Sequence, residues 1–322
     1  MKKCIAAIVA ASLAFTVGVA SAQDKKTRIA IGTGGTSGVY YPLGGGLAAV
    51  LSKYVPGVDA TAEVTAGSIA NLQLIGGGKS EMGFTMADSA WDAYNGLEKF
   101  KDKKVGLRTL VVFYPNRMQV VTVEGKGIEK FADLKGKRIS TGAPASGTEV
   151  MSMRLLEAHG IDPNKDVTRE RLSVGESVSA IKDGKIDALM WVGGVPTPGL
   201  TDLAATPGKK IKLIDHGDGA EGMRKKYGPI YVKNRILANA YPGESRETTN
   251  VDVWNLLVVP ENADEKLVYE ITKTMFEKKE ELVKVHKDAS FLSLDTQMTG
   301  ASPIPFHPGA LRYFKEKGLK VN

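Results

Sequence analysis

One local pattern occurs twice in this chain: a short β-type run, a loop rich in glycine and small hydroxyl residues, and the start of a helix. The first copy spans residues 28–41 (RIAIGTGGTSGVYY) and the second spans residues 138–148 (RISTGAPASGT). A further pair of matching segments begins at Gly67 and Gly175, at similar distances beyond the two loops. The repeat predicts two lobes of one plan, each exposing backbone N–H groups at a helix start, with a small anion held between them.

The N-terminus has the features of a secretory signal. A Lys-Lys pair precedes an apolar run over residues 5–19, and the sequence Ala-Ser-Ala ending at Ala22 matches a cleavage site. The run is shorter than the roughly 20 residues of a transmembrane helix, although an uncleaved anchor is the alternative. The only cysteine, Cys4, precedes this run. We expect a signal peptide at 1–22, cleavage after Ala22 and a periplasmic protein without thiol, disulfide or zinc–thiolate chemistry.

Composition and motifs exclude several classes of function. The 43 basic and 36 acidic residues give a net charge of +7, which fits an anionic ligand but is explained equally well by surface lysines. The basic residues alternate with acids and lack interleaved aromatics, so no nucleic acid is expected. The glycine-rich loop lacks the Lys-Ser/Thr of a P-loop, and Ser37 stands where a dinucleotide site needs glycine. We find no nucleophile elbow and no metal-binding histidine pair, and we expect no cofactor and no metal.

Strand-like and helix-like segments alternate along the chain, which predicts an α/β fold with mainly parallel sheets flanked by helices. Residues 68–75 predict a short helix with Ser68 as its N-cap. Residues 193–228 predict an irregular stretch rich in Gly, Pro and charge. Residues 262–285 carry one helical pattern.

Two stretches are predicted to cross between the lobes. Residues 107–114 and 118–124 form nearly continuous β-rich runs, separated only by Pro-Asn-Arg at 115–117, and residues 250–259 read as a strand that returns. We therefore assign 23–115 plus 252–322 to lobe 1 and 116–251 to lobe 2. Two crossings form a hinge pair, the geometry of clamshell closure.

Motifs along the whole mature chain resemble the TAXI family, the solute receptors of TRAP transporters. The opening segment 32–47 (GTGGTSGVYYPLGGGL) carries the resemblance, supported by segments at 63–68, 87–96, 133–138, 142–148, 241–243 and 307–313. The resemblance implies a two-lobed type II periplasmic-binding-protein fold that delivers small organic acids or amino acids, such as glutamate or 2-oxoglutarate, to a TRAP membrane permease. One position departs from the family, which often has Gln where this chain has Met86. If that Gln touches ligand in relatives, the preferred solute differs here.

The loops supply the candidate ligand-binding residues. In lobe 1 these are Gly34, Gly35, Thr36, Ser37, Val39, Tyr40, Ala87 and Asp88. In lobe 2 they are Ala145, Ser146, Gly147, Thr148, Gly193, Gly194, Val195, Pro196 and Thr197. Arg117, just past the first crossing, is the candidate counter-charge because its guanidinium suits bidentate carboxylate binding; a surface arginine near the hinge is the alternative. Ser146 with Glu149 also matches a capping box, which needs no ligand.

These features predict a monomeric, non-enzymatic receptor that closes over one small carboxylate. An enzyme acting on small acids on the same scaffold is one alternative, since a fold alone does not define a function. A sensory receptor that feeds a signalling partner is another, and the sequence does not discriminate it from a transport receptor.

The paired loops yield a test by substitution. Ser37→Ala and Ser146→Ala should each weaken ligand binding roughly 10- to 150-fold, because each removes a hydroxyl hydrogen bond to a charged group worth about 1.5–3 kcal/mol. Ser146→Ala should also cost about 1 kcal/mol of stability without ligand, through loss of a helix cap. Calorimetry with melting curves of the ligand-free variants measures both effects. Full affinity in Ser146→Ala with only a lowered melting point would mean that the second loop is a cap and no more.

Overall fold

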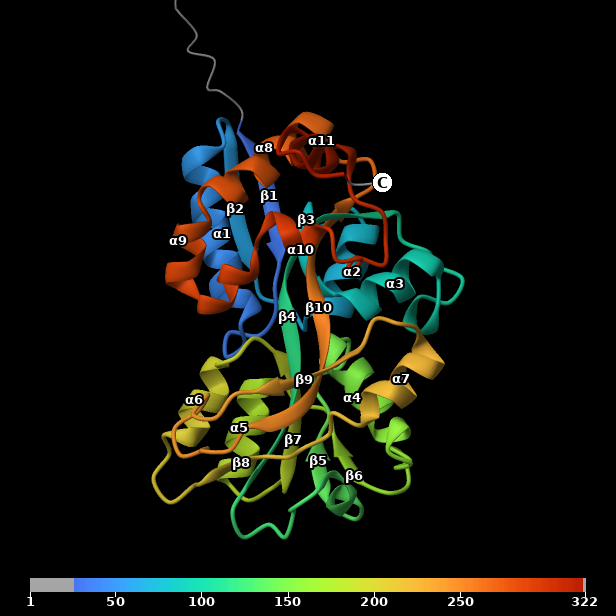
Figure 1. Ribbon diagram of the computed structural model, residues 1–322, viewed down its shortest axis with the longest axis vertical. Coiled ribbons are helices and arrows are strands. Elements are labelled where there is room, and N and C mark those ends of the chain that lie inside the picture. The colour runs from blue at the N-terminus through green and yellow to red at the C-terminus, as the bar shows by residue number, and fades with distance from the viewer. Residues whose placement is uncertain (1–25, 321–322) are drawn as a thin grey trace, which may run out of the picture.

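The computed structural model describes residues 26–320, which form two halves joined by two long strands (Figure 1). The predicted signal peptide and its cleavage site lie outside the described residues. Both long strands, β4 (Leu107–Val123) and β10 (Thr248–Pro260), run through the upper and the lower half of the molecule. They are the crossings expected from the β-rich runs.

The strands form a single sheet with the order β2-β1-β3-β10-β4-β7-β5-β6, and β8 and β9 pair with β4 and β10. The other strands are β1 (Thr27–Gly32), β2 (Val58–Glu63), β3 (Met82–Met86), β5 (Arg138–Ser140), β6 (Thr168–Glu170), β7 (Ala188–Gly193), β8 (Ile211–Leu213) and β9 (Val232–Ile236). Strands β1, β2 and β3 are parallel in the upper half, and β5, β6 and β7 are parallel in the lower half. The crossing strands pair antiparallel to their neighbours. The α/β class is confirmed, with one continuous sheet shared by the two halves.

Helices flank the sheet in both halves. The upper half contains α1 (Tyr40–Tyr54), α2 (Ser68–Gly76), α3 (Ala87–Asn95), α8 (Glu265–Glu277), α9 (Lys279–Val285), α10 (Leu294–Gln297) and α11 (Pro308–Glu316). The lower half contains α4 (Gly147–Ala158), α5 (Val174–Lys182), α6 (Pro198–Ala204) and α7 (Gly219–Tyr227). One buried apolar cluster continues across the crossing strands, from Leu72 and Met86 in the upper half to Leu155 and Met190 in the lower.

The strand β4 continues through Pro115, where the sequence showed an interruption. Pro115 lies opposite Trp254, next to a register shift in the β4–β10 ladder. Proline has no N–H to donate, so an irregular position in the ladder is where a strand tolerates it. The strands change partners close by, since Arg117 pairs with Asp252 of β10 and with Gly193 of β7. The predicted lobe boundaries stay predictions, and this change of partners supports them.

Two expectations about secondary structure were wrong. The stretch 193–228 contains α6, β8 and α7, and the pattern at 262–285 is divided at Lys278 into α8 and α9. In α7 only Gly219, Ala220 and Met223 are buried, so two of its three core-facing positions carry little or no side chain. Such a helix shows almost no apolar periodicity in its sequence.

A buried histidine makes stability depend on pH. His216 follows β8, is 1% exposed and donates from Nδ1 to the Ile214 carbonyl at 2.7 Å. Burial lowers the pKa of His216 to about 4, from an ordinary value near 6.5. Between these values the unfolded chain binds the proton more readily than the folded protein does. Stability that is complete at pH 7 is therefore lost as the pH falls from 6.5 towards 4.

We expect the wild-type protein to lose roughly 2–3 kcal/mol more than His216→Asn between pH 7 and pH 4.5, because one pKa unit corresponds to about 1.4 kcal/mol. Asparagine keeps an N–H donor but does not titrate. Urea unfolding of both proteins at the two pH values measures the difference. Equal losses in the two proteins would contradict the assignment.

Candidate functional site

The first residues of four helices converge on a cavity of about 60 Å³ between the two halves. They are Val39 and Tyr40 at α1, Gly67 and Ser68 at α2, Ser146, Gly147 and Thr148 at α4, and Ser173 and Val174 at α5. The remaining lining residues are Gly34, Gly35, Gly38, Thr65, Ala66, Met86, Tyr114, Ala143, Trp191 and Gly193. We call this space the central cavity.

The topology places the four helix starts together. Each of these helices follows a strand of a parallel ladder: α1 follows β1, α2 follows β2, α4 follows β5 and α5 follows β6. The carboxyl ends of parallel strands lie at one edge of a sheet, where α/β proteins bind ligands. In this molecule the carboxyl edges of both parallel ladders face the space between the halves.

The electrostatics of the central cavity come from helix ends and not from charged side chains. None of the lining residues is Lys, Arg, Asp, Glu or His. Each helix N-terminus carries a partial positive charge of about half a unit, with N–H groups that lack intrahelical partners. Four such ends around one small cavity favour a small anion.

The two halves differ in how much of that partial charge is already compensated. In the lower half, Ser146 and Ser173 cap α4 and α5, and Glu149 and Glu176 lie in the first turns. In the upper half, α1 and α2 have neither a side-chain cap nor an acidic residue in the first turn. One N–H of the first turn of α2, that of Ala70, is already paired with the Ala145 carbonyl. The most open positive pole of the central cavity is therefore at the start of α1.

Two tyrosines, Tyr40 and Tyr114, line the central cavity. The Tyr40 hydroxyl accepts a hydrogen bond from Asn116 Nδ2 at 3.2 Å. Tyr114 is fully buried, and its hydroxyl lies beside the buried side chain of Asn255. Burial raises the pKa of Tyr40 and of Tyr114 well above the ordinary value of 10. Both hydroxyls therefore keep their protons at neutral pH.

The two halves touch around the central cavity. The Ala70 N–H donates to the Ala145 carbonyl at 3.1 Å, and the Gly199 N–H donates to the Ser37 carbonyl at 3.0 Å. Gly147 lies against the upper half so closely that a Cβ there would be 2.6 Å from the Met86 sulfur. We call this arrangement, with the two halves in contact around the central cavity, the closed arrangement.

The structure brings together about half of the residues expected at the site. Those that line the central cavity are Gly34, Gly35, Val39, Tyr40, Ser146, Gly147, Thr148 and Gly193. Those that lie outside it are Thr36, Ser37, Ala87, Asp88, Arg117, Ala145, Gly194, Val195, Pro196 and Thr197. Ligand contact by the first set stays a prediction.

The position of Arg117 does not support its expected role as counter-charge. Its guanidinium lies 3.4 Å from Asp288, and both side chains are largely buried. Asp288 also accepts a hydrogen bond from the Val195 N–H at 2.9 Å. Its carboxylate therefore holds Arg117 and the loop at 194–197 to the upper half. Arg117 has its ionic partner within the protein and does not reach the central cavity.

Several other expected contacts serve the protein itself. Asp88 accepts a hydrogen bond from Tyr231 and is fully buried, away from the central cavity. The Ser146 hydroxyl donates to the Ala143 carbonyl at 2.7 Å and accepts from the Glu149 N–H at 3.0 Å, so its capping role is confirmed. Ser68 was expected as the cap of α2, but the N-cap is Gly67 and the Ser68 hydroxyl accepts from the Met86 N–H.

Sequence reasoning missed Tyr114, Trp191, the segment 65–68, and Ser173 with Val174. It also left out three further lining residues, Gly38, Met86 and Ala143. The matched loops at Gly67 and Gly175 were recognised as part of the repeat, and that signal could have placed α2 and α5 at the site. Tyr114 and Trp191 come from the middle of strands, and no local motif marks them.

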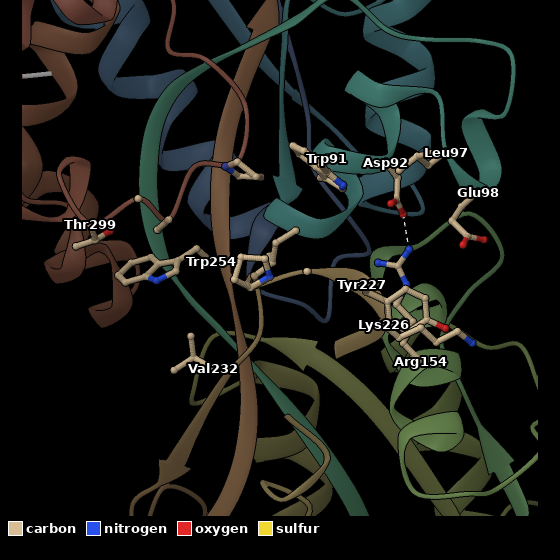
Figure 2. Close-up of a pocket in the computed structure, with 16 residues that line it drawn as sticks. Trp91, Asp92, Leu97, Glu98, Arg154, Lys226, Tyr227, Val232, Trp254 and Thr299 are labelled. Atoms are coloured by element: carbon tan, nitrogen blue, oxygen red, sulfur yellow. Dashed lines mark hydrogen bonds and ion pairs between the residues drawn. The ribbon is translucent and has the colours of Figure 1, made fainter. Parts of the chain in front are cut away.

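A larger cavity, of about 760 Å³, lies between α3, α7 and the segment 299–303 (Figure 2). At its edge Arg154 of α4 reaches across to Asp92 of α3, with Nη2 and Oδ2 at 2.6 Å. Arg154 also lies 3.6 Å from Asp88 and donates to the Tyr231 hydroxyl at 2.8 Å. This buried cluster is a further link between the halves.

Residues 31–318 match the model of the NMT1-like family. Among solved structures, the fold resembles a protein from Bordetella bronchiseptica RB50, with 19% identity, a TM-score of 0.51, and coverage of 90% of this chain and 89% of that one. The periplasmic aliphatic sulphonate binding protein SsuA from Escherichia coli matches with 14% identity and a TM-score of 0.47, over 90% and 82% of the two chains. A putative L-cystine ABC transporter protein from Listeria monocytogenes matches with 17% identity and a TM-score of 0.49, over 81% and 94%.

The contact at Gly147 yields a prediction about closure. Gly147→Ala should weaken binding of any ligand held in the closed arrangement by tenfold or more, because the new Cβ would clash with Met86 and Ser68. The ligand-free protein should keep its melting point, since alanine is the better helix former and the halves can separate. Gly45→Ala in α1 is the matched control, because a Cβ there meets nothing within 4 Å. Calorimetry and melting curves test this, and unchanged affinity in Gly147→Ala would show that closure does not need the contact.

Proposed function

The chain belongs to the NMT1-like family, and we propose that it is an extracytoplasmic receptor that holds one small carboxylate between its halves and passes it to a membrane permease. The observation that carries the proposal is the convergence of four helix N-termini on a small cavity without charged side chains. Partial positive charges and free N–H groups bind an anion and release it again without a strong ion pair. A transport receptor needs both steps.

The two-strand connection supports capture by closure. The halves are linked through β4 and β10, and around the central cavity they meet through loops and helix starts. Hinged closure around a ligand uses such a pair of connections. The division into 23–115 plus 252–322 and 116–251 is the one we propose for the two moving lobes.

The permease and the compartment are proposed from the sequence. The signal-like N-terminus supports export and cleavage after Ala22. Among residues 26–320, no helix is long and apolar enough to cross a membrane. The motifs that resemble the TAXI family support a TRAP permease as the partner and a monomeric, non-enzymatic receptor. The same resemblance implies an amino acid such as glutamate, or a dicarboxylate such as 2-oxoglutarate, as the class of solute.

Two measurements on the mature protein test this proposal. After unfolding and refolding to remove carried ligand, a small carboxylate at a hundred times its dissociation constant should stabilise the protein by about 2.7 kcal/mol. The same ligand should reduce the radius of gyration in solution scattering without changing the molecular mass. A panel of small carboxylates that leaves the melting point unchanged would contradict carboxylate binding. An unchanged radius at saturation would contradict closure.

A further inference from the structure

We propose that closure of the receptor takes up a proton at a buried group of two carboxylates and one guanidinium between the halves, so that the solute binds more tightly in mild acid. This inference rests on the proposed function and adds a form of regulation to it. The carboxylates are those of Asp88 and Asp92 on α3 in the upper half, and the guanidinium is that of Arg154 on α4 in the lower half. We call these three side chains the Arg154 cluster.

The Arg154 cluster contains more negative than positive charge. Arg154 Nη2 lies 2.6 Å from Oδ2 of Asp92 (Figure 2), and its Nη1 lies 3.6 Å from Oδ2 of Asp88. None of the three side chains is more than 6% exposed. The Tyr231 hydroxyl donates to Asp88 at 2.7 Å and accepts from Arg154 at 2.8 Å, and it brings no charge. One guanidinium therefore serves two carboxylates, and one negative charge is left over in a buried space.

The surrounding groups do not balance this extra charge. The nearby charged side chains of the lower half pair with one another: Lys226 with Glu157, and Arg169 and Arg171 with Glu149. The Tyr227 ring lies 4.4 Å from the guanidinium carbon of Arg154 and is uncharged. In the upper half, Glu98 adds a further carboxylate after α3, and its neighbour Lys99 is exposed to solvent.

A proton on Asp92 removes the excess charge. Two carboxylates that share one buried cation are costly to keep ionised together. Burial, with the negative charges of Asp88 and Glu98, raises the pKa of Asp92 to about 6 against the opposing effect of Arg154; the ordinary value is near 4. Asp92 and Arg154 also line the cavity of about 760 Å³, whereas Asp88 is fully buried. Solvent in that cavity can deliver the proton to Asp92.

Closure and protonation are linked because the Arg154 cluster spans the two halves. When α3 and α4 separate, the carboxylates regain hydration, and the pKa of Asp92 returns towards its ordinary value. Between about pH 4 and pH 6 the closed arrangement therefore binds the proton more readily than the open one. By linkage, closure becomes more favourable as the pH falls through 6 towards 4, and this advantage is absent at neutral pH. A ligand that closes the receptor binds more tightly by the same factor.

Calorimetry on the refolded mature protein tests the inference, with L-glutamate and 2-oxoglutarate as probes. The wild-type protein should bind about tenfold more tightly at pH 5 than at pH 7, as a closed-state pKa near 6 requires. At pH 6, titrations in buffers of different ionisation enthalpy should show uptake of about half a proton for each ligand bound. Melting curves at each pH check that the protein stays folded, because buried His216 lowers stability in acid.

Asp92→Asn distinguishes proton uptake from a simple ion-pair latch. The variant should bind at pH 7 at least tenfold more tightly than the wild type, because the closed cluster then contains one carboxylate and one guanidinium. Its affinity should be nearly equal at pH 5 and pH 7, with no proton uptake at pH 6. Asp59→Asn, at an exposed position of β2, is the matched control and should keep the pH dependence of the wild type.

The outcomes separate this inference from the proposed function. An ion pair that only holds the halves together predicts weaker binding in Asp92→Asn at pH 7, and that result would overturn the inference. Equal pH dependence in the wild type and in Asp92→Asn, or no proton uptake by the wild type at pH 6, would also overturn it. Each of these results leaves a carboxylate receptor standing. Failure of both probes to bind at either pH would contradict the proposed function together with this inference.

Discussion

The antiparallel pairing of β4 with β10 organises the whole molecule. The two strands pair with each other from Leu107 opposite Pro260 to Arg117 opposite Asp252. Beyond that point β4 pairs with β7, and β10 pairs with β9. Each half builds its parallel ladder on the outer edge of this pair. Because the ladders grow from opposite ends of shared strands, their carboxyl edges face each other. The convergence of four helix starts is a consequence of this topology, and the central cavity lies where they meet.

The charged side chains near the central cavity form ion pairs with one another outside it. Arg117 pairs with Asp288, Arg154 pairs with Asp92, and Arg171 pairs with Glu149. What remains inside is the partial charge of helix ends and a set of hydroxyl groups. A full arginine charge in a buried site would bind a carboxylate more strongly, yet it would be left unpaired each time the ligand departs. Helix ends carry no such penalty, because their dipole is part of the fold.

The repeated architecture could be predicted from the sequence more reliably than the side-chain contacts could. The glycine-rich loops, the strand at 82–86 and both crossing strands could be located because they have local signals: glycine at turns and short runs of apolar and β-branched residues. The roles of Arg117 and Asp88 could not, because each is decided by a distant partner, Asp288 or Tyr231, which no local pattern reveals. Tyr114 was missed for the same reason, since no local pattern shows which strand tyrosine lines a cavity.

The links between the halves suit a protein that must open as well as close. The cluster of Arg154 with Asp92 and Asp88 is buried when the halves meet, and its charges regain hydration when they separate. Desolvation then offsets much of the Coulomb attraction, so the cluster aligns the halves without holding them firmly. The backbone bonds at Ala70 and Gly199 likewise exchange with water at a net cost of about 1 kcal/mol each. Closure therefore depends on what the ligand adds. A solute that binds the starts of α1 and α2 in the upper half, and that also touches Gly147 and Thr148 of α4 in the lower half, interacts with both halves at once. Its binding free energy is thereby available to shift the equilibrium towards the closed arrangement.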